Sequence, residues 1–281
     1  MPVPSLLVEP QIRAALAEDL GRVGDITTNA TIDTEQRSKV VMAAREPGVV
    51  AGIECARIAF SLLDPTAIIE ISAPDGSAVA PGDVVMTVTG QTRALLSAER
   101  VALNFVGHLS GVATATNSLV KAVAHTKARI VDTRKTLPGL RALEKAAVFS
   151  GGGVNHRFGL DDAVLIKDNH IAAAGSLTRA VEKAKAAVGH LVKIEVEVDT
   201  LEQLRELLAT EKADAVLLDN MSPETLREAV ELVDGRLTTE ASGKVTIENV
   251  AAIAESGVDL ISSGWITHSA KNLDLGLDYV S

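Results

Sequence analysis

The sequence has few aromatic residues, a single cysteine and no long uncharged apolar stretch. Aromatic side chains make up 2% of the 281 residues, so the chain lacks the stacking surfaces with which single-strand nucleic-acid binders hold bases. The lone Cys55 excludes an intramolecular disulfide and a cysteine metal cluster, which fits a reducing compartment. No stretch offers the ~20 apolar residues of a membrane span, and the first residues lack the basic segment and apolar core of a signal peptide. We therefore expect a cytoplasmic protein that binds neither nucleic acid nor a membrane.

The composition is otherwise that of an enzyme-sized globular protein with a locally basic segment. Hydrophobic residues make up 47% of the chain, which is enough for the core of one large barrel or of two domains. The formal net charge is -10, yet residues 127–170 contain eight Lys and Arg side chains against five Asp and Glu side chains. A basic site in an acidic protein predicts a pocket for a small anion, because a nucleic acid would need a broad basic face.

The first part of the chain predicts a mixed α+β domain. A helix is expected over 9–20, followed by a polar turn at 24–28. Short β-branched runs between residues 38 and 90 predict strands, with a helix over 55–63 between them. A further helix is expected over 94–109. No catalytic set of residues is evident in this part.

The rest of the chain predicts alternating strands and helices. Six strands are expected, and the last four recur every 22 residues. The strands centre near Val131, Leu165, Ile194, Val216, Thr238 and Leu260. Thr200 with Gln203 reads as a capping box, and Ser222-Pro223 as a helix start. Regular spacing without a Rossmann glycine fingerprint favours a barrel over a doubly wound sheet.

We therefore predict an α/β protein of two domains. Residues 1–112 form an N-terminal α+β domain, and residues 113–281 form a C-terminal β/α barrel that carries the site. The barrel is expected to be incomplete, since only six strands are evident. Its last residues are free to pack back on the first domain.

Polar residues gather at the C-terminal ends of the predicted strands, where barrel enzymes place their sites. They are Arg134-Lys135, Lys167 to His170, Glu197, Asp219-Asn220, Ser242-Gly243 and Ser263-Gly264. Charged side chains would be costly deeper in the strands, so one convergent site is expected. Glu195 and Glu197 share a strand face by period-two alternation and would need partners such as Lys167 or a metal.

These residue types suit a ligand with several negative groups. Arg offers a rigid fork for carboxylate or phosphate, and Lys adds a point charge. The cations of this expected cage are Arg134, Lys135, His156, Arg157 and Lys167. Glu197 and Asp219, on adjacent strands, predict either a Mg²⁺ site or an ion pair with a lysine, and the sequence leaves both open.

Three further positions complete the predicted site. Ser242-Gly243 and Ser263-Gly264 follow the last two strands, where barrel enzymes bind phosphate through backbone N–H groups. Arg100 is expected near a helix start, where a cation opposes the positive end of the helix dipole. An arginine at this unfavourable position is explained either by burial in a salt bridge or by reach toward an anionic ligand.

Long stretches of the chain resemble one family, the quinolinate phosphoribosyltransferases, which are decarboxylating enzymes of NAD biosynthesis. The resemblance covers nearly the whole chain in order. The stretches that carry it are EDLGRVGDITT (18–28), SAERVALNFVGHLSGVAT (97–114), DTRKTLPGLRALEKAAV (132–148), GGGVNHRFGLDDAVLIKDNH (151–170), KIEVEVD (193–199), VLLDN (216–220) and GVDLISSGWITHS (257–269).

The resemblance implies a fold, a reaction and a set of site residues. The fold is that of type II phosphoribosyltransferases, and the reaction converts quinolinate and phosphoribosyl pyrophosphate to nicotinate mononucleotide, pyrophosphate and CO₂ with Mg²⁺. It implies a homodimer with shared active sites, in which Arg100 reaches the partner's site. The implied quinolinate ligands are Arg100, Arg134, His156, Arg157 and Lys167. The implied catalytic residues are Lys135, Lys167, Glu197 and Asp219. Of these, Glu197 and Asp219 would also bind the metal ion and the ribose hydroxyls. The implied phosphate-binding residues are Ser242, Gly243, Ser263 and Gly264.

One departure and two alternatives accompany this interpretation. The family usually has Ser-Gly-Gly or Ser-Gly-Asn where this chain has Ser242-Gly243-Lys244, so Lys244 could add a phosphate contact or obstruct the loop. A paralogous phosphoribosyltransferase with another substrate should lose part of the cationic cage, which is complete here. A non-catalytic anion-binding barrel should lose Glu197 or Asp219, and both are present.

Overall fold

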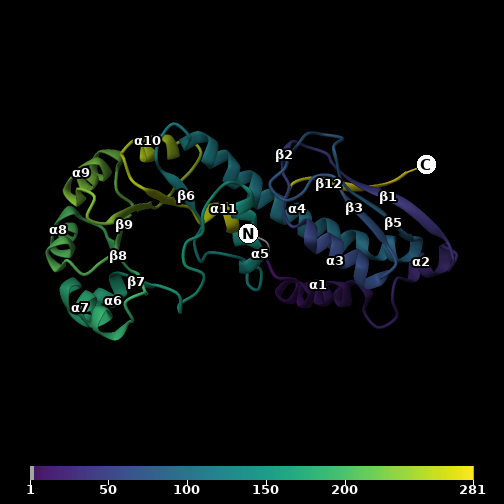
Figure 1. Cartoon of the computed structure of the whole chain (residues 1–281), viewed down its shortest axis with the longest axis horizontal. Coiled ribbons are helices and arrows are strands. Elements are labelled where there is room, and N and C mark those ends of the chain that lie inside the picture. The colour runs from purple at the N-terminus through teal and green to yellow at the C-terminus, as the bar shows by residue number, and fades with distance from the viewer. Residues whose placement is uncertain (1–2, 281) are drawn as a thin grey trace. The chain divides into compact units, whose positions relative to one another are not determined.

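The chain divides into two units that are each assembled from separate segments (Figure 1). The computed structural model describes residues 3–280. The first unit comprises the chain up to Asn117, residues 136–152 and the chain from Ile266; the second comprises residues 118–135 and 153–265. Within residues 3–280, no helix combines the length and the apolar character needed to cross a membrane.

The first unit is built on an antiparallel sheet in the strand order β12-β1-β5-β3. Its strands are β1 (Arg37–Ala44), β3 (Ile68–Ile71), β5 (Val84–Gln91) and β12 (Leu275–Tyr279), and a second small sheet pairs β2 (Gly48–Val49) with β4 (Ala78–Val79). The C-terminal strand β12 lies in register with β1, with Met42 opposite Leu277. The unit's shorter helices are α1 (Ser5–Leu20), which packs on α3 (Ile53–Leu63), together with α2 (Ile26–Thr31) and α5 (Arg141–Ser150).

The polar turn predicted at residues 24–28 is wrong, because most of it belongs to helix α2. Gly24, at a φ of 76°, redirects the chain after α1. Asp25 then caps the new helix, since its Oδ1 accepts a hydrogen bond from the Thr28 amide at 2.9 Å. The hydrogen bonds with Thr28 hold the pKa of the Asp25 carboxyl below its usual value.

The helix predicted over 94–109 is also much longer than expected. Helix α4 (Thr92–Val123) runs without interruption for 32 residues, through a segment rich in small residues that favour helices weakly. Packing explains why one of these small residues is a glycine, because a Cβ at Gly111 would collide with the backbone carbonyl of Lys271. The glycine permits close packing of the C-terminal segment against α4, and does not end the helix.

The second unit contains the predicted repeat of strands and helices. Its six parallel strands have the order β6-β11-β10-β9-β8-β7. They are β6 (Arg129–Val131), β7 (Val164–Ile166), β8 (Ile194–Val198), β9 (Ala215–Asp219), β10 (Thr238–Ser242) and β11 (Leu260–Ser262). The sheet curves but does not close, because β6 and β7 are its two edges (Figure 1). The expectation of an incomplete β/α barrel is confirmed.

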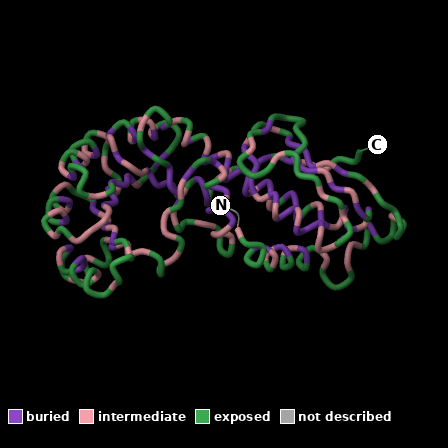
Figure 2. The backbone as a smooth tube through the Cα atoms, in the orientation of Figure 1, coloured by how far each residue is buried: buried purple, intermediate pink, exposed green. Residues whose placement is uncertain are grey.

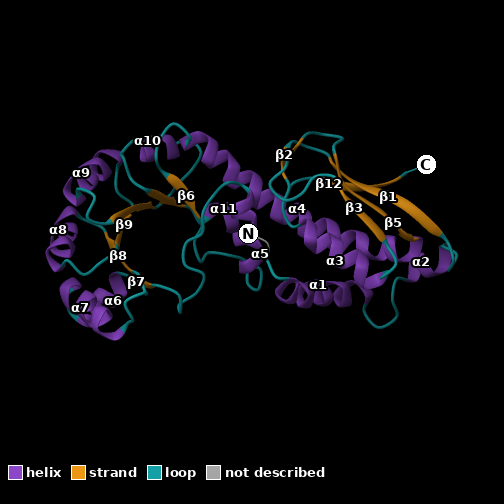
Figure 3. Ribbon diagram, in the orientation of Figure 1, coloured by secondary structure: helices purple, strands orange, loops and turns teal. Residues whose placement is uncertain are grey.

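Helices cover the outer side of this sheet (Figure 3). They are α6 (Asp168–Ala174), α7 (Leu177–Ala187), α8 (Leu201–Thr210), α9 (Pro223–Val233) and α10 (Val250–Ala254), while the short α11 (Trp265–His268) follows β11. Their apolar faces and the strands form the core, and Figure 2 shows the strands largely buried and the outer helix turns exposed. The capping box of Thr200 with Gln203 and the Ser222 cap before Pro223 are both present as predicted.

Candidate active site

A cavity of about 580 Å³ lies at the C-terminal ends of the strands in the second unit. The position follows from the fold, because all six parallel strands deliver the residues after them to this end of the sheet. The predicted site residues that line it are Arg134, Lys135, His156, Arg157, Lys167, Glu197, Asp219, Ser242 and Gly243. The sequence interpretation of one convergent site is thus supported by where these side chains lie.

Lys167 and Glu197 form an ion pair across neighbouring strands. Lys167 follows β7, and Glu197 is the next-to-last residue of β8, on the face that also carries Glu195. Lys167 Nζ donates to Glu197 Oε2. The Lys167 side chain is 44% exposed and that of Glu197 13% exposed, so the lysine remains open to a ligand. Asp219, at the end of β9, accepts a hydrogen bond on Oδ2 from Asn220 Nδ2 at 2.5 Å. Each carboxylate keeps a second oxygen for another partner.

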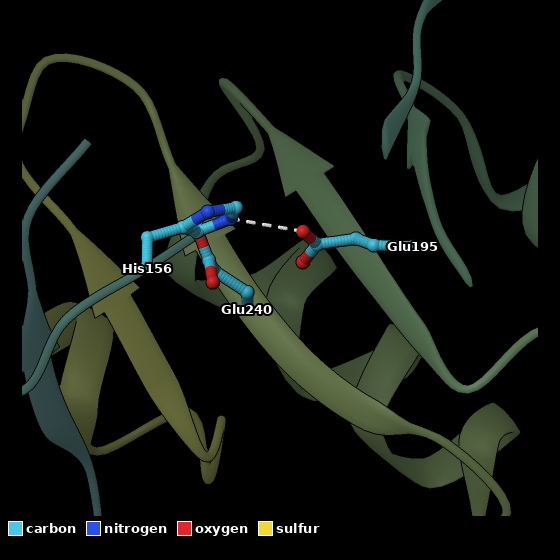
Figure 4. Close-up of side chains that lie close together, drawn as sticks. All are labelled: His156, Glu195 and Glu240. Carbon is cyan, nitrogen blue, oxygen red and sulfur yellow. Dashed lines mark hydrogen bonds and ion pairs between the residues drawn. The ribbon is translucent and has the colours of Figure 1, made fainter. Parts of the chain in front are cut away.

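The segment before Arg157 runs beside β6 and fixes the orientation of His156. Val154 forms a parallel bridge with Val131, and the buried Asp132 accepts a hydrogen bond on Oδ1 from the His156 amide at 2.8 Å. The Arg157 amide donates to His156 Nδ1 at 2.7 Å. Because Nδ1 accepts, the ring proton sits on Nε2, which donates to Glu195 Oε2 at 2.9 Å (Figure 4).

Arg157 is positioned for an anion. Its guanidinium donates one bond to the Ala163 carbonyl at 3.0 Å, while its buried Nε has no hydrogen-bond partner among residues 3–280. Burial and the nearby positive charge of Arg134 lower the pKa of the Arg157 guanidinium. Two guanidinium groups that repel each other in one cavity would both gain from a ligand with negative charge between them.

Glu240 is a site residue that the sequence interpretation missed. It lies in β10, is 1% exposed, and places Oε1 3.7 Å from His156 Nε2 (Figure 4). Burial, followed by the nearby Glu195 carboxylate, raises the pKa of the Glu240 carboxyl to about 7. The signal was available, because Glu240 precedes Ser242 by two residues and so shares its strand face.

The loop after β10 lines the cavity, whereas β11 contributes only Ser262, its last residue. Gly243 has a φ of 138°, and a Cβ there would lie 2.8 Å from Asn220 Oδ1, so only glycine fits without strain. Lys244 is exposed and also lines the cavity. Ser263 is buried and its amide donates to the Val131 carbonyl at 3.0 Å; neither it nor Gly264 is among the lining residues.

Arg100 belongs to the first unit and does not begin a helix. It lies more than two turns inside α4, because that helix starts at Thr92. Its side chain is exposed, and no ion pair involving it occurs within residues 3–280. The salt-bridge explanation for this arginine is therefore wrong, and reach toward an anionic ligand stays a prediction.

Comparison with known proteins assigns both parts of the chain to one family. Residues 25–110 match the quinolinate phosphoribosyl transferase N-terminal domain, and residues 112–278 match the C-terminal domain. A probable nicotinate-nucleotide pyrophosphorylase (carboxylating) of Bacillus subtilis is 46% identical over 93% of this chain and 89% of its own length. The corresponding protein of Mycobacterium leprae is 47% identical over 95% of each chain.

Solved structures agree with this assignment. The crystal structure of NadC from Streptococcus pyogenes superposes with a TM-score of 0.95 at 40% identity, covering 100% of both chains. The nicotinate-nucleotide pyrophosphorylase of Francisella tularensis gives the same TM-score of 0.95, also at 40% identity. The chain therefore belongs to the quinolinate phosphoribosyltransferase family and is a phosphoribosyltransferase of NAD biosynthesis.

Proposed function

We propose that this enzyme joins quinolinate to phosphoribosyl pyrophosphate and releases nicotinate mononucleotide, pyrophosphate and CO₂. The observation that carries the substrate assignment is the content of one cavity. Arg134, Lys135, Arg157 and Lys167 bring four cationic side chains to it, and Glu197 and Asp219 lie beside them. Cations in that number suit a dicarboxylate together with a diphosphate, and two carboxylates suit a sugar and a metal ion.

Quinolinate binding rests on the cations that converge from three segments. Arg134 and Arg157 repel each other until an anion lies between them, and the free Nε of Arg157 offers a further donor. Lys167 is half-exposed at the cavity edge and can turn from Glu197 to a ligand carboxylate. His156 lines the same cavity with a fixed ring, and its Nε2–H, which Glu195 accepts here, is the donor that it would share with the ligand. These contacts orient the pyridine nitrogen toward the anomeric carbon of the second substrate.

The phosphoribosyl half rests on the loop after β10 and on Lys135. Gly243 brings its backbone close to Asn220 at the rim of the cavity, where backbone N–H groups and the Ser242 hydroxyl suit a 5′-phosphate. Lys244 adds positive charge at the same rim. Lys135 lies between the two halves and balances charge that develops on the departing diphosphate. Stabilisation of this charge by fixed cations supplies most of the catalysis.

The residues present fit a Mg²⁺ ion. Glu197 and Asp219 lie at the C-terminal ends of adjacent strands, as the next-to-last and the last residue, and each has one carboxylate oxygen that is not used by Lys167 or Asn220. Mg²⁺ commonly takes one or two protein carboxylates and shares its remaining positions with waters and phosphates. When bound, the ion would neutralise diphosphate charge. Glu197 and Asp219 would in addition accept hydrogen bonds from the ribose hydroxyls.

A homodimer with shared sites is the assembly we propose, in the cytoplasm. Its support is Arg100, an exposed arginine with no ion pair within residues 3–280, on a helix of the unit that lacks the cavity. Subunit complementation tests it. Arg100→Ala and Lys167→Ala damage different subunits of a shared site, so an equal mixture of the two inactive variants should recover about a quarter of wild-type activity. Recovery below a few per cent would contradict a shared site.

The reaction itself is tested with purified protein, Mg²⁺, phosphoribosyl pyrophosphate and either quinolinate or nicotinate. Nicotinate mononucleotide should form from quinolinate only, because nicotinate lacks the second carboxylate that the cationic cage would hold. Product from nicotinate would refute the assignment of the cage. No product from either substrate, in folded protein, would refute the proposed function.

A further inference from the structure

Glu240 is a buried carboxyl group at the floor of the cavity, and the substrate contacts proposed above leave it unused. Its Oε1 lies 3.7 Å from His156 Nε2 and has no hydrogen-bond partner among residues 3–280 (Figure 4). A buried carboxylate oxygen without a donor is costly. A neutral carboxyl group avoids most of that cost and keeps a proton within reach of the imidazole.

The groups that face Glu240 favour the neutral form. Glu195 approaches from β8, Asp132 from the end of β6, Ser262 from β11 and His156 from the segment beside β6. Two of these are carboxyl groups, and only His156 could supply a positive charge. Burial, followed by the Glu195 carboxylate, raises the pKa of Glu240 to about 7, against a smaller opposite effect of His156.

The hydrogen bonds of His156 limit what the imidazole can offer. Its Nδ1 accepts from the Arg157 amide, so a second ring proton would point at an N–H group. The neutral ring has one proton, on Nε2, and Glu195 accepts it. Nε2 is therefore a site through which a single proton can pass and be replaced.

The same geometry speaks against a metal ion at this cluster, although ligand atoms of His156, Glu195 and Glu240 lie within 4.8 Å of one another. A metal on Nε2 would force the ring proton onto Nδ1, where the Arg157 amide already donates. A proton needs no such change. The cluster therefore suits proton transfer.

The proposed reaction needs one proton after the glycosyl bond forms. The bond between C2 and its carboxylate breaks, CO₂ leaves, and the electron pair stays on C2 beside the cationic ring nitrogen. That carbon must then gain a proton to give nicotinate mononucleotide. Resting on the proposed function, we propose that Glu240 supplies this proton and that His156 passes it into the cavity.

The transfer balances in three moves. The Nε2–H bond of His156 breaks as the new C2–H bond forms, and the freed Nε2 electron pair takes the proton from Glu240 Oε1. Glu240 is left as a buried carboxylate beside Glu195, a state that burial and the neighbouring like charge both disfavour. It regains a proton from water once the product has left, and the site is restored.

The test is Glu240→Gln, which keeps the shape of the side chain and removes the acid. In a single turnover with enzyme in excess, pyrophosphate and nicotinate mononucleotide are measured separately. We expect pyrophosphate formation within about twofold of wild type and nicotinate mononucleotide formation slowed ~100-fold, as for loss of a general acid. The dicarboxylated nucleotide should accumulate. Equal slowing of both steps, or slowing of neither, would overturn the proposal.

Two further variants separate chemistry from packing. Glu240→Asp retains an acid and should recover part of the rate of the second step. Glu144→Gln removes another buried glutamate that binds a histidine, through Glu144 Oε1 and His108 Nε2 at 2.8 Å, in the first unit. In that variant any change should fall on both steps alike. If Glu144→Gln slowed nicotinate mononucleotide formation but not pyrophosphate formation, as expected for Glu240→Gln, that result would count against a proton-donor role.

Wild-type protein provides an independent measurement if Glu240→Gln fails to fold. In wild type, the rate of nicotinate mononucleotide formation should fall as pH rises above about 7, where Glu240 loses its proton. The rate of pyrophosphate formation should show no such fall. Parallel pH profiles for the two steps would refute the inference. Absence of any product from wild type would instead refute the proposed function.

Discussion

Replacing Glu240 by glutamine should stabilise the second unit at alkaline pH while impairing the enzyme. Burial and Glu195 raise the pKa of Glu240 from 4.5 to about 7. The folded chain therefore binds more protons than the unfolded chain between these values, and stability falls as pH rises through this range. Glutamine stays neutral at every pH, so the variant escapes this loss.

The magnitude follows from the pKa difference. One pKa unit corresponds to 1.36 kcal/mol, and the carboxyl group is almost fully buried, so solvent screening is small. Between about pH 5 and about pH 8.5, the free energy of unfolding of Glu240→Gln should rise relative to wild type by about 2 to 3 kcal/mol. Other titrating groups contribute to both proteins and largely cancel in the difference.

Urea unfolding followed by Trp265 fluorescence measures this difference. Trp265 is the only tryptophan of the chain and belongs to the second unit. Both proteins are compared at one concentration, because assembly shifts apparent stability. Glu231→Gln, at an exposed position of α9 in the same unit, is the matched control and should change stability by less than about 0.5 kcal/mol at either pH. A pH-independent difference between Glu240→Gln and wild type would refute the reasoning.

Three substitutions test other parts of the structure. Lys167→Met should raise the quinolinate Kd by about 10- to 100-fold in calorimetric titration. Lys167 is 44% exposed, so the binding free energy that is lost is that of a charge-assisted hydrogen bond and not that of a buried ion pair. Gly243→Ala should raise the KM for phosphoribosyl pyrophosphate at least ~10-fold with little change in quinolinate affinity. The new Cβ would lie 2.8 Å from Asn220 Oδ1, and the backbone φ of 138° is strained for alanine. Equal effects on both substrates would contradict a phosphate role. Gly111→Ala should destabilise the first unit by about 1–3 kcal/mol in scanning calorimetry, because the new Cβ meets the Lys271 carbonyl, and an unchanged transition would show that the C-terminal segment can shift.

Most strands of the second unit could be predicted from short apolar or alternating runs followed by polar residues, and β10, which reads Thr-Thr-Glu-Ala-Ser, could be placed by the 22-residue spacing. The sequence centres fall within the observed strands, and the 22-residue period reflects one strand, one helix and two turns per repeat. The open edge between β6 and β7 agrees with six strands being too few to close a barrel. Helix caps were readable because Thr200 and Ser222 act on amides three residues away.

The errors arise where distant residues decide local structure. The end of α4 was placed too early, since the small residues after Leu109 favour helices weakly. What keeps them helical is packing, and the space that Gly111 must leave is set by Lys271, far along the chain. Arg100 was misjudged for a different, local reason, because the helix begins at Thr92 and not near Ser97.

Glu240 shows how a site residue can be missed although its strand is predicted. Period-two alternation was applied to Glu195 and Glu197. Glu197 has the expected partner, Lys167, whereas Glu195 is paired with His156 and not with Lys167. Applied to β10, the same rule would have placed Glu240 on the face of Ser242, inside the barrel. No local pattern, however, indicates that Glu195 would already hold the only proton of His156.

That arrangement requires the segment beside β6 to deliver an imidazole whose Nδ1 is already occupied. The partly buried Glu195 and the buried Glu240 then share one neutral histidine. A hydrophobic residue in place of Glu240 would pack in the strand at lower cost. An acid that destabilises the folded chain above neutral pH, and that makes no substrate contact proposed here, is best explained by a step that needs its proton. Decarboxylation is that step, and the separate timing of pyrophosphate and nicotinate mononucleotide formation in Glu240→Gln decides it.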